Sequence, residues 1–261
     1  LVLMRCPAIT FKIKASLASA TPLIFATEAV PILMRVYGER TDSMWSLICF
    51  EFNLQTLEGR FLNLAEVYFS VDIEADGPIP GVNSMLSLGC AAFDPEGQAL
   101  GTFSANLIPL PDATPDPKTM AWWETQPIAW EACQANQRDP VDVMPEFAKW
   151  VWATAGENVK PVFAAWPVGF DFTYVYWYLM RFHGQSPFSH HALDIRSFAM
   201  AYMNLTYRSC HKSKLQKRLK DRLNPTHRHD HIAVHDAIEQ GELLVALLKA
   251  NRDLHQQRSV G

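Results

Sequence analysis

The chain has 261 residues, of which 49% are hydrophobic, and its 23 basic and 27 acidic residues give a net charge of −4. This composition excludes disordered and collagen-like chains, and five cysteines without a Cys-x-x-Cys pair exclude a disulfide scaffold and a zinc ribbon. Such cysteine usage favours a reducing compartment, and we expect the protein to be cytoplasmic. The acidic balance taken by itself argues against a nucleic-acid partner, because nucleic acids attract positive charge.

Residues 1–66 differ from the rest of the chain. Their uncharged run at 15–27 contains Pro22 and is too short to cross a bilayer, which requires roughly 20 apolar residues. Basic residues before this run resemble the start of a signal peptide, but we expect residues 1–66 to be a poorly ordered extension outside the working domain. That domain is expected at residues 67–255, followed by a short tail at 256–261, with no membrane as partner.

From residue 67 the hydrophobic pattern becomes regular. Aromatic and β-branched runs that end at turn residues predict strands, and apolar residues at helical spacing predict helices. The expected strands are 68–75, 85–93, 100–110, 161–166 and 191–195, and the expected helices are 119–137, 144–155, 170–182 and 231–251. The prolines between residues 109 and 117 predict an extended connection without helix. Three strands followed by alternating helices and strands predict an α/β fold with a mixed sheet.

The first predicted strand carries two acidic side chains, Asp72 and Glu74. Because strand side chains alternate with a period of two, both carboxylates lie on one face, with Val71 and Ile73 on the other. Two like charges buried together are unfavourable, and a cation between them resolves the repulsion. An Asp-x-Glu pair also arises by chance about once in a chain of this length, and then it marks only a solvated strand end.

Two further carboxylates follow later in the chain. Asp171 comes just after the strand expected at 161–166, in the first turn of the next helix, where an acidic residue is ordinarily a cap or a partner of the helix dipole. Asp236 follows His231 by five residues, and residues five apart on a helix point about 140° apart. His231 and Asp236 therefore meet only if His231 lies in the loop that enters the last helix, for which Asp230 is a suitable N-cap.

Several histidines precede Asp236 in the sequence and suggest a metal site: His227, His229, His231 and His235. We discount zinc, because this spacing has no cysteine partner and no His-Glu-x-x-His frame. The oxygen-rich acidic residues elsewhere favour Mg²⁺ or Mn²⁺.

The order of these motifs resembles the DEDDh family of 3′–5′ exonucleases, which includes ribonuclease T, oligoribonuclease and proofreading subunits of DNA polymerases. The resemblance rests on Asp-x-Glu in the first strand, Asp after a later strand, and His-x-Ala-x-x-Asp near the end, and it covers residues 67–248. It implies a ribonuclease H-like fold with a five-stranded mixed sheet, and two divalent cations, Mg²⁺ or Mn²⁺. The implied metal ligands are Asp72, Glu74, Asp171 and Asp236. The implied general base is His231, with His235 as a rival because it also neighbours Asp236.

Two features suggest how a substrate binds. Residues 207–228 carry eight basic residues and one acidic residue, a local charge of +7 that the net charge hides. Such a run is usually a solvated face, but its place before His231 favours contacts to a phosphate backbone. The expected contacts are Lys212, Lys214, Lys217 and Arg218. The neighbouring Trp122 and Trp123 are expected either to stack on bases or to pack in the core.

The sequence therefore predicts a metal-dependent 3′–5′ exonuclease that releases nucleoside monophosphates from the free 3′ end of single-stranded RNA or DNA. The alternative is a non-catalytic nucleic-acid-binding module on the same scaffold, against which the complete set of acidic residues and histidine argues. A structural protein that uses its aromatic segments as a partner surface is a third hypothesis. The aromatic residues at 174–178 are also a candidate interface for a homodimer.

Overall fold

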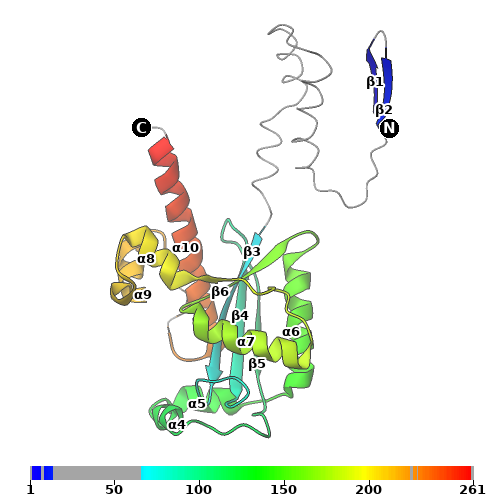
Figure 1. Ribbon diagram of the computed structural model, residues 1–261. Coiled ribbons are helices and arrows are strands. Elements are labelled where there is room, and N and C mark those ends of the chain that lie inside the picture. Colours follow the sequence, from blue (N-terminus) through cyan, green and yellow to red (C-terminus); the bar gives the residue numbers. More distant parts are fainter. Residues whose placement is uncertain (1, 7–8, 14–65, 224–225, 228, 260–261) are drawn as a thin grey trace. The chain divides into compact units, whose positions relative to one another are not determined.

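The computed structural model describes residues 2–6, 9–13, 66–223, 226–227 and 229–259 (Figure 1). The chain divides into two units, Leu1–Leu62 and Asn63–Gly261. In the first unit, β1 (Val2–Cys6) pairs antiparallel with β2 (Ile9–Ile13), a hairpin that the sequence analysis did not predict. The rest of the predicted N-terminal extension, residues 14–65, lies outside the described residues.

The second unit is built on a mixed sheet of five strands in the order β5-β4-β3-β6-β7. The strands are β3 (Glu66–Ala75), β4 (Met85–Phe93), β5 (Ala99–Asn106), β6 (Lys160–Ala165) and β7 (Ala192–Asp194). The first three pair antiparallel, whereas β3 pairs parallel with β6, and β6 with β7. The predicted α/β fold with a five-stranded mixed sheet is confirmed.

The helices of this unit agree with the predicted ones in part. They are α4 (Pro117–Trp123), α5 (Pro127–Gln134), α6 (Pro140–Ala155), α7 (Val168–Phe182), α8 (Ile195–Met203), α9 (Lys212–Arg218) and α10 (Ala233–Ser259), with a 3-10 turn η1 (Tyr207–Ser209). The single helix expected at 119–137 is wrong, because Pro127 cannot continue a helix and instead begins α5. The region of prolines was expected to exclude helix, yet Pro117 begins α4, whose N-cap Asp116 accepts a hydrogen bond from the Thr119 N–H.

The helices cover the sheet on both faces. On one face, α6 and α7 pack against the odd-numbered side chains of β3 in the main core, which contains Val71, Ile73 and Tyr174. On the other face, α10 packs against β3 and β4, with Leu244 and Val245 in its contacts to the sheet. The period of two predicted for β3 is therefore confirmed, and Asp72 and Glu74 point to the face that α10 covers. None of the described helices is long and apolar enough to span a bilayer.

One glycine lets α10 approach the sheet closely. Gly89 of β4 lies opposite Asp72 in the strand register, and a Cβ at Gly89 would be 2.1 Å from the backbone carbon of Ala233. Since real atoms do not approach so closely, any other residue at this position would push the first turn of α10 away from β3. Gly89 thus brings Asp236, in that first turn, toward Asp72.

Candidate active site

The four predicted acidic residues converge at one end of the sheet. Asp72 and Glu74 come from β3, Asp171 from the first turn of α7, and Asp236 from the first turn of α10. Carboxylate oxygens of Asp72, Glu74 and Asp236 lie within 4.8 Å of one another. Asp171 joins them because its Oδ1 accepts a hydrogen bond of 3.0 Å from the backbone N–H of Ile73, between the two acidic residues of β3.

Burial makes this group of carboxylates electrostatically costly. Burial, followed by repulsion from Asp171 and Glu74, raises the pKa of Asp72 well above its ordinary value. Burial and the neighbouring carboxylates likewise raise the pKa of Glu74 to about 9. The pKa of Asp171 rises to about 7, again through burial, although the hydrogen bond from Ile73 opposes the rise. Like charges held together in this way are typical of a site that binds a cation.

The donor set suits hard divalent cations. Carboxylate oxygens are the ligands that Mg²⁺ and Mn²⁺ prefer, and β3 and α10 bring three of them together, with Asp171 of α7 beside them. A basic side chain is held near them by another acidic residue, since Lys212 Nζ lies 2.9 Å from Glu239 Oε2. The charge of Lys212 lowers the pKa of Asp72 and of Asp171, but it does not reverse the rise that burial causes.

These pKa shifts predict how stability depends on pH when no metal is bound. The folded protein holds protons on Glu74 and Asp72 that the unfolded chain releases, because their pKa values are higher in the folded state. The contribution of Glu74 to the free energy of unfolding is therefore fully present below the ordinary pKa of 4.5. It is lost as the pH rises toward the folded-state pKa of about 9. We expect the free energy of unfolding, measured with urea in chelator, to be lower at alkaline pH than at acidic pH. Mn²⁺ should flatten this dependence, and an increase in stability with pH in chelator would contradict the prediction.

The buried side chain of Gln240 holds Asp72 in place. Its Oε1 accepts a hydrogen bond of 2.7 Å from the backbone N–H of Trp166, and its Nε2 donates one of 2.6 Å to Asp72 Oδ1. The backbone N–H can only donate, so the amide orientation is set and the donor group must face Asp72. The sequence analysis missed Gln240, because no local pattern links it to a strand 168 positions earlier.

Loss of this hydrogen bond should weaken cation binding. We expect Gln240→Met to lower the affinity for Mn²⁺ by about 10- to 100-fold, as is usual when a partner that orients a metal ligand is removed. The measurement is calorimetric titration of the metal-free protein. Gln216→Met is the matched control, because Gln216 donates to Glu239 and not to a metal ligand. Equal affinities in the Gln240 variant and the control would contradict the prediction.

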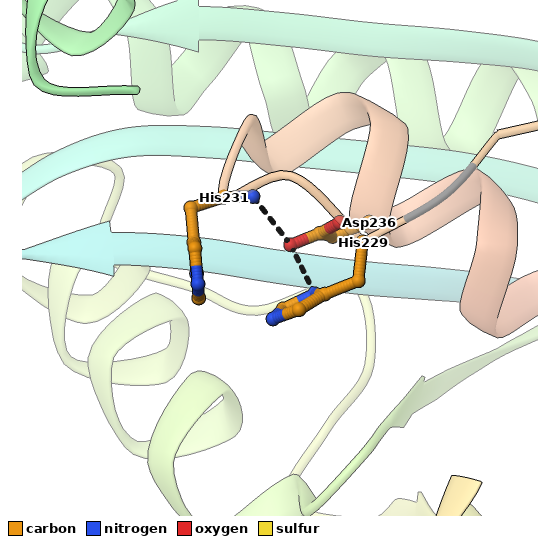
Figure 2. Close-up of side chains that lie close together, drawn as sticks. All are labelled: His229, His231 and Asp236. Carbon is orange, nitrogen blue, oxygen red and sulfur yellow. Dashed lines mark hydrogen bonds and ion pairs between the residues drawn. The ribbon is translucent and has the colours of Figure 1, made fainter. Parts of the chain in front are cut away.

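The loop that enters α10 is fixed by Asp236. Its Oδ1 accepts a hydrogen bond from the backbone N–H of Asp230 at 3.1 Å. Its Oδ2 accepts one from the backbone N–H of His231 at 3.2 Å (Figure 2). Because α10 begins at Ala233, His231 lies in the entering loop, as the five-residue spacing predicted. The backbone of His231 has φ +61°, a left-handed conformation that is uncommon for a residue with a side chain.

The histidine side chain that contacts Asp236 is His229, not His231. His229 Nδ1 lies 2.7 Å from Asp236 Oδ2 (Figure 2), whereas His231 Nδ1 lies 3.8 Å from Glu74 Oε1. Burial raises the pKa of Asp236, but the hydrogen bond and charge of His229, with smaller contributions from Asp230 and Lys212, together outweigh burial, so the net shift of this pKa is downward. The role of His229 was missed in the sequence, although the alternating His-x-His spacing before Asp236 was its signal.

The rival histidine, His235, points away from the carboxylates. Its Nδ1 lies 2.9 Å from Asp230 Oδ2, and its ring stacks near that of His227 with a centroid distance of 4.6 Å. His231, by contrast, is placed against both Glu74 and the ring of Trp122, with a ring-centroid distance of 4.9 Å to the latter. Of these two histidines, only His231 reaches the carboxylate group.

The two neighbouring tryptophans have different environments. Trp123 is 2% exposed and its Nε1 donates a hydrogen bond of 3.0 Å to the carbonyl oxygen of Ala75, so its ring packs in the core, the second of the two expected alternatives. Trp122 is 37% exposed and borders the site beside His231. Only Trp122 of the pair presents a ring surface that an incoming base can reach.

Some side chains of the basic segment, residues 207–228, form ion pairs, and others are exposed to solvent. Lys212 and Gln216 of α9 both bind the buried Glu239 of α10, and Arg222 forms an ion pair with Asp253. The other predicted contacts on α9 have exposed side chains: Lys214, Lys217 and Arg218. The cationic surface is thus smaller than the sequence charge of the segment suggests.

Part of the aromatic surface of α7 is buried, although Phe170 is 40% exposed. Tyr174, Val175 and Tyr178 are buried in the main core, and the Tyr174 hydroxyl donates to the carbonyl oxygen of Gly77. These side chains are therefore unavailable for the contact between subunits for which residues 174–178 were a candidate. A homodimer stays a prediction without support from this helix.

Comparison with known proteins agrees with this geometry. Residues 67–248 match the family model described as a 3′–5′ exoribonuclease Rv2179c-like domain. The 3′–5′ DNA exonuclease Cap18 of Escherichia coli is 36% identical over 180 residues, which span 68% of this chain and 89% of that protein. The fold resembles the nuclease domain of 3′hExo, a DEDDh family member bound to rAMP, with a TM-score of 0.55 and 11% identity over 72% of this chain and 94% of that domain.

The family model and the Escherichia coli relative place the protein among the 3′–5′ exonucleases, which are phosphodiester hydrolases, and they confirm the predicted enzyme class. Its fold is similar to the ribonuclease H-like fold of a DEDDh nuclease domain. Nucleic acid is the partner of this class. Within it, the chain belongs to the family of 3′–5′ exoribonuclease Rv2179c-like domains.

Proposed function

We propose that the protein removes nucleoside monophosphates one at a time from the free 3′ end of single-stranded RNA or DNA, with two divalent cations, Mg²⁺ or Mn²⁺. The observation that carries this proposal is the convergence of four carboxylates from β3, α7 and α10 at one buried place. We assign the activity to residues 67–255. The cysteine spacing makes the cytoplasm the compartment in which we expect it to act.

Each acidic residue has a distinct position as a proposed metal ligand. Asp72 and Glu74 extend from the same strand face, Asp171 is held beside them by Ile73, and Asp236 closes the group from α10. Bound divalent cations lower the pKa of a nearby water and stabilise the charge that develops on a phosphate. The chain's own contribution is to hold the ligands in register, through Gln240 at Asp72 and Gly89 beneath α10.

His231 is the proposed general base. Burial lowers its pKa, so the ring is neutral near pH 7 and can accept a proton from the attacking water. Its Nδ1 lies 3.8 Å from Glu74 Oε1, close to the carboxylate group but not bonded within it. The left-handed backbone conformation of the loop directs the ring to this place.

Substrate contacts are proposed on two sides of the carboxylate group. The exposed ring of Trp122 is the proposed stacking surface for a base near the 3′ end. The proposed contacts to the phosphate backbone are Lys212, Lys214, Lys217 and Arg218 on α9. Lys212 binds Glu239 beside the carboxylates, so of these four side chains it is the one proposed to contact the scissile phosphate.

A matched set of substrates tests the proposal. Single-stranded and double-stranded RNA and DNA oligonucleotides of one sequence, labelled at the 5′ end, are incubated with Mg²⁺ or Mn²⁺, and the products are read for length. We expect shortening from the 3′ end in single-residue steps, with single strands preferred. The family model is named for RNA and the Escherichia coli relative for DNA, so the rate ratio between the two sugars assigns the substrate. Binding without cleavage of all four would support the non-catalytic module instead.

A further inference from the structure

Two histidines and Asp236 form a second group of possible metal ligands beside the carboxylates. Ring nitrogens of His229 and His231 and a carboxylate oxygen of Asp236 lie within 4.8 Å of one another (Figure 2). The two imidazole rings are adjacent, with a centroid distance of 4.3 Å, and the His229 ring contacts the Asp236 carboxylate (Figure 2). Asp236 is shared with the group that also contains Asp72 and Glu74.

The two groups differ in the kind of cation they suit. Carboxylates alone favour hard ions such as Mg²⁺, whereas two imidazole nitrogens with one carboxylate favour Zn²⁺. Tetrahedral coordination with Zn–N distances of about 2.0–2.1 Å requires ligand atoms about 3.4 Å apart. The imidazoles can reach this spacing by rotating about their side-chain bonds, since the side chains of His229 and His231 are 49% and 28% exposed.

We propose that His229, His231 and Asp236 form a separate site for Zn²⁺, and that Zn²⁺ bound there inhibits the nuclease. A ring nitrogen of His231 that coordinates Zn²⁺ cannot accept a proton. At the same time, Asp236 binds Zn²⁺ and is no longer available as a ligand with Asp72 and Glu74. The cation site stands on its own geometry, whereas the inhibition rests on the proposed roles of His231 and Asp236. The proposal differs from the sequence-based argument against zinc, because Asp236 provides a third ligand in place of the cysteine that the histidine spacing lacks.

Binding to metal-free, full-length protein tests the site without any substrate. Co²⁺ is the spectroscopic probe, because its visible absorption reports tetrahedral nitrogen and oxygen ligands, and Zn²⁺ affinity is measured by displacement. We expect His229→Gln and His231→Gln each to lower Zn²⁺ affinity at least about 10-fold. His235→Gln is the matched control, because its ring contacts Asp230, and it should bind Zn²⁺ as the unaltered protein does.

A second comparison separates the two cation sites. Asp72→Asn should lose Mn²⁺ binding and keep Zn²⁺ binding. His229→Gln should lose Zn²⁺ binding and still bind Mn²⁺, weakened by no more than about 10- to 100-fold because His229 contacts the ligand Asp236, and this Mn²⁺ binding also shows that the variant is folded. The proposal is overturned if Asp72→Asn weakens Zn²⁺ as much as His229→Gln does, because zinc then occupies the carboxylate group. Equal Zn²⁺ affinities of His229→Gln and the unaltered protein would overturn it as well.

The inhibition is measured as the Zn²⁺ concentration that halves the Mg²⁺-dependent rate, relative to each variant's own uninhibited rate. We expect this concentration to rise about 10-fold or more in His229→Gln and to stay the same in His235→Gln. If Zn²⁺ binds at the histidines without slowing hydrolysis, the inhibitory part is overturned and His231 is not the base. If no variant or unaltered protein hydrolyses any substrate, the proposed function fails while the binding result stands.

Discussion

The Asp72→Asn protein should lose at least about 10³-fold in kcat, the scale on which an electrostatic group at the reacting phosphate acts. Asp72 lies among Asp171, Glu74 and Asp236 and is fixed by Gln240, so no other side chain can take its place. The amide keeps the size of the carboxylate and can still accept the hydrogen bond from Gln240. The fall in kcat therefore measures the loss of a charge and of a metal ligand, and not a change in packing.

The same substitution should stabilise the metal-free fold. Burial and the neighbouring carboxylates disfavour the charged form of Asp72, and a neutral amide removes that repulsion. Kinetics with a labelled single strand and urea unfolding in chelator measure the two effects. Asp112→Asn, at an exposed position, is the control and should change neither. Substantial activity in the Asp72→Asn protein would remove Asp72 from the metal ligands.

His231→Gln should lower kcat by about 10²-fold or more, the contribution expected of a general base. The glutamine side chain cannot take up a proton at neutral pH, so the variant should also lose the acidic limb of the pH–rate profile. KM for the oligonucleotide should change little, because the ring touches Trp122 and Glu74 and not the basic segment.

Matched variants of the neighbouring histidines identify the base. His235→Gln should keep nearly full activity, because its ring contacts Asp230 outside the carboxylate group. An unchanged rate in His231→Gln together with a large fall in His235→Gln would transfer the role to His235. An unchanged rate in both would transfer it to solvent.

The first strand shows how far local pattern can predict. Its period of two placed Asp72 and Glu74 on one face and Val71 and Ile73 on the other, and the structure agrees because the odd-numbered side chains enter the core under α6 and α7. The spacing of His231 and Asp236 required a loop before the last helix, and α10 begins at Ala233. Both predictions depend only on the geometry of one element.

The two tryptophans mark where such prediction ends. Their sequence allowed either stacking on bases or packing in the core. Trp123 is buried because it packs at the end of β3, where its Nε1 donates a hydrogen bond to the carbonyl oxygen of Ala75. The basic segment shows the same limit of prediction. Its charge can be counted from the sequence, but the ion pairs of Lys212 with Glu239 and of Arg222 with Asp253 cannot be predicted from it. Local charge counts therefore overstate the surface open to a nucleic acid.

The sequence by itself predicted the class of enzyme, because each acidic motif is a local pattern and their order along the chain resembles that of the DEDDh exonucleases. It also showed that a net charge of −4 conceals a basic segment. Only the tertiary structure shows that Gln240 donates a hydrogen bond to Asp72, that Gly89 allows α10 to pack closely against the sheet, and that His229 contacts Asp236. The first two contacts join segments far apart in the chain, and the third depends on a loop whose course Asp236 sets, so packing and not local pattern creates them.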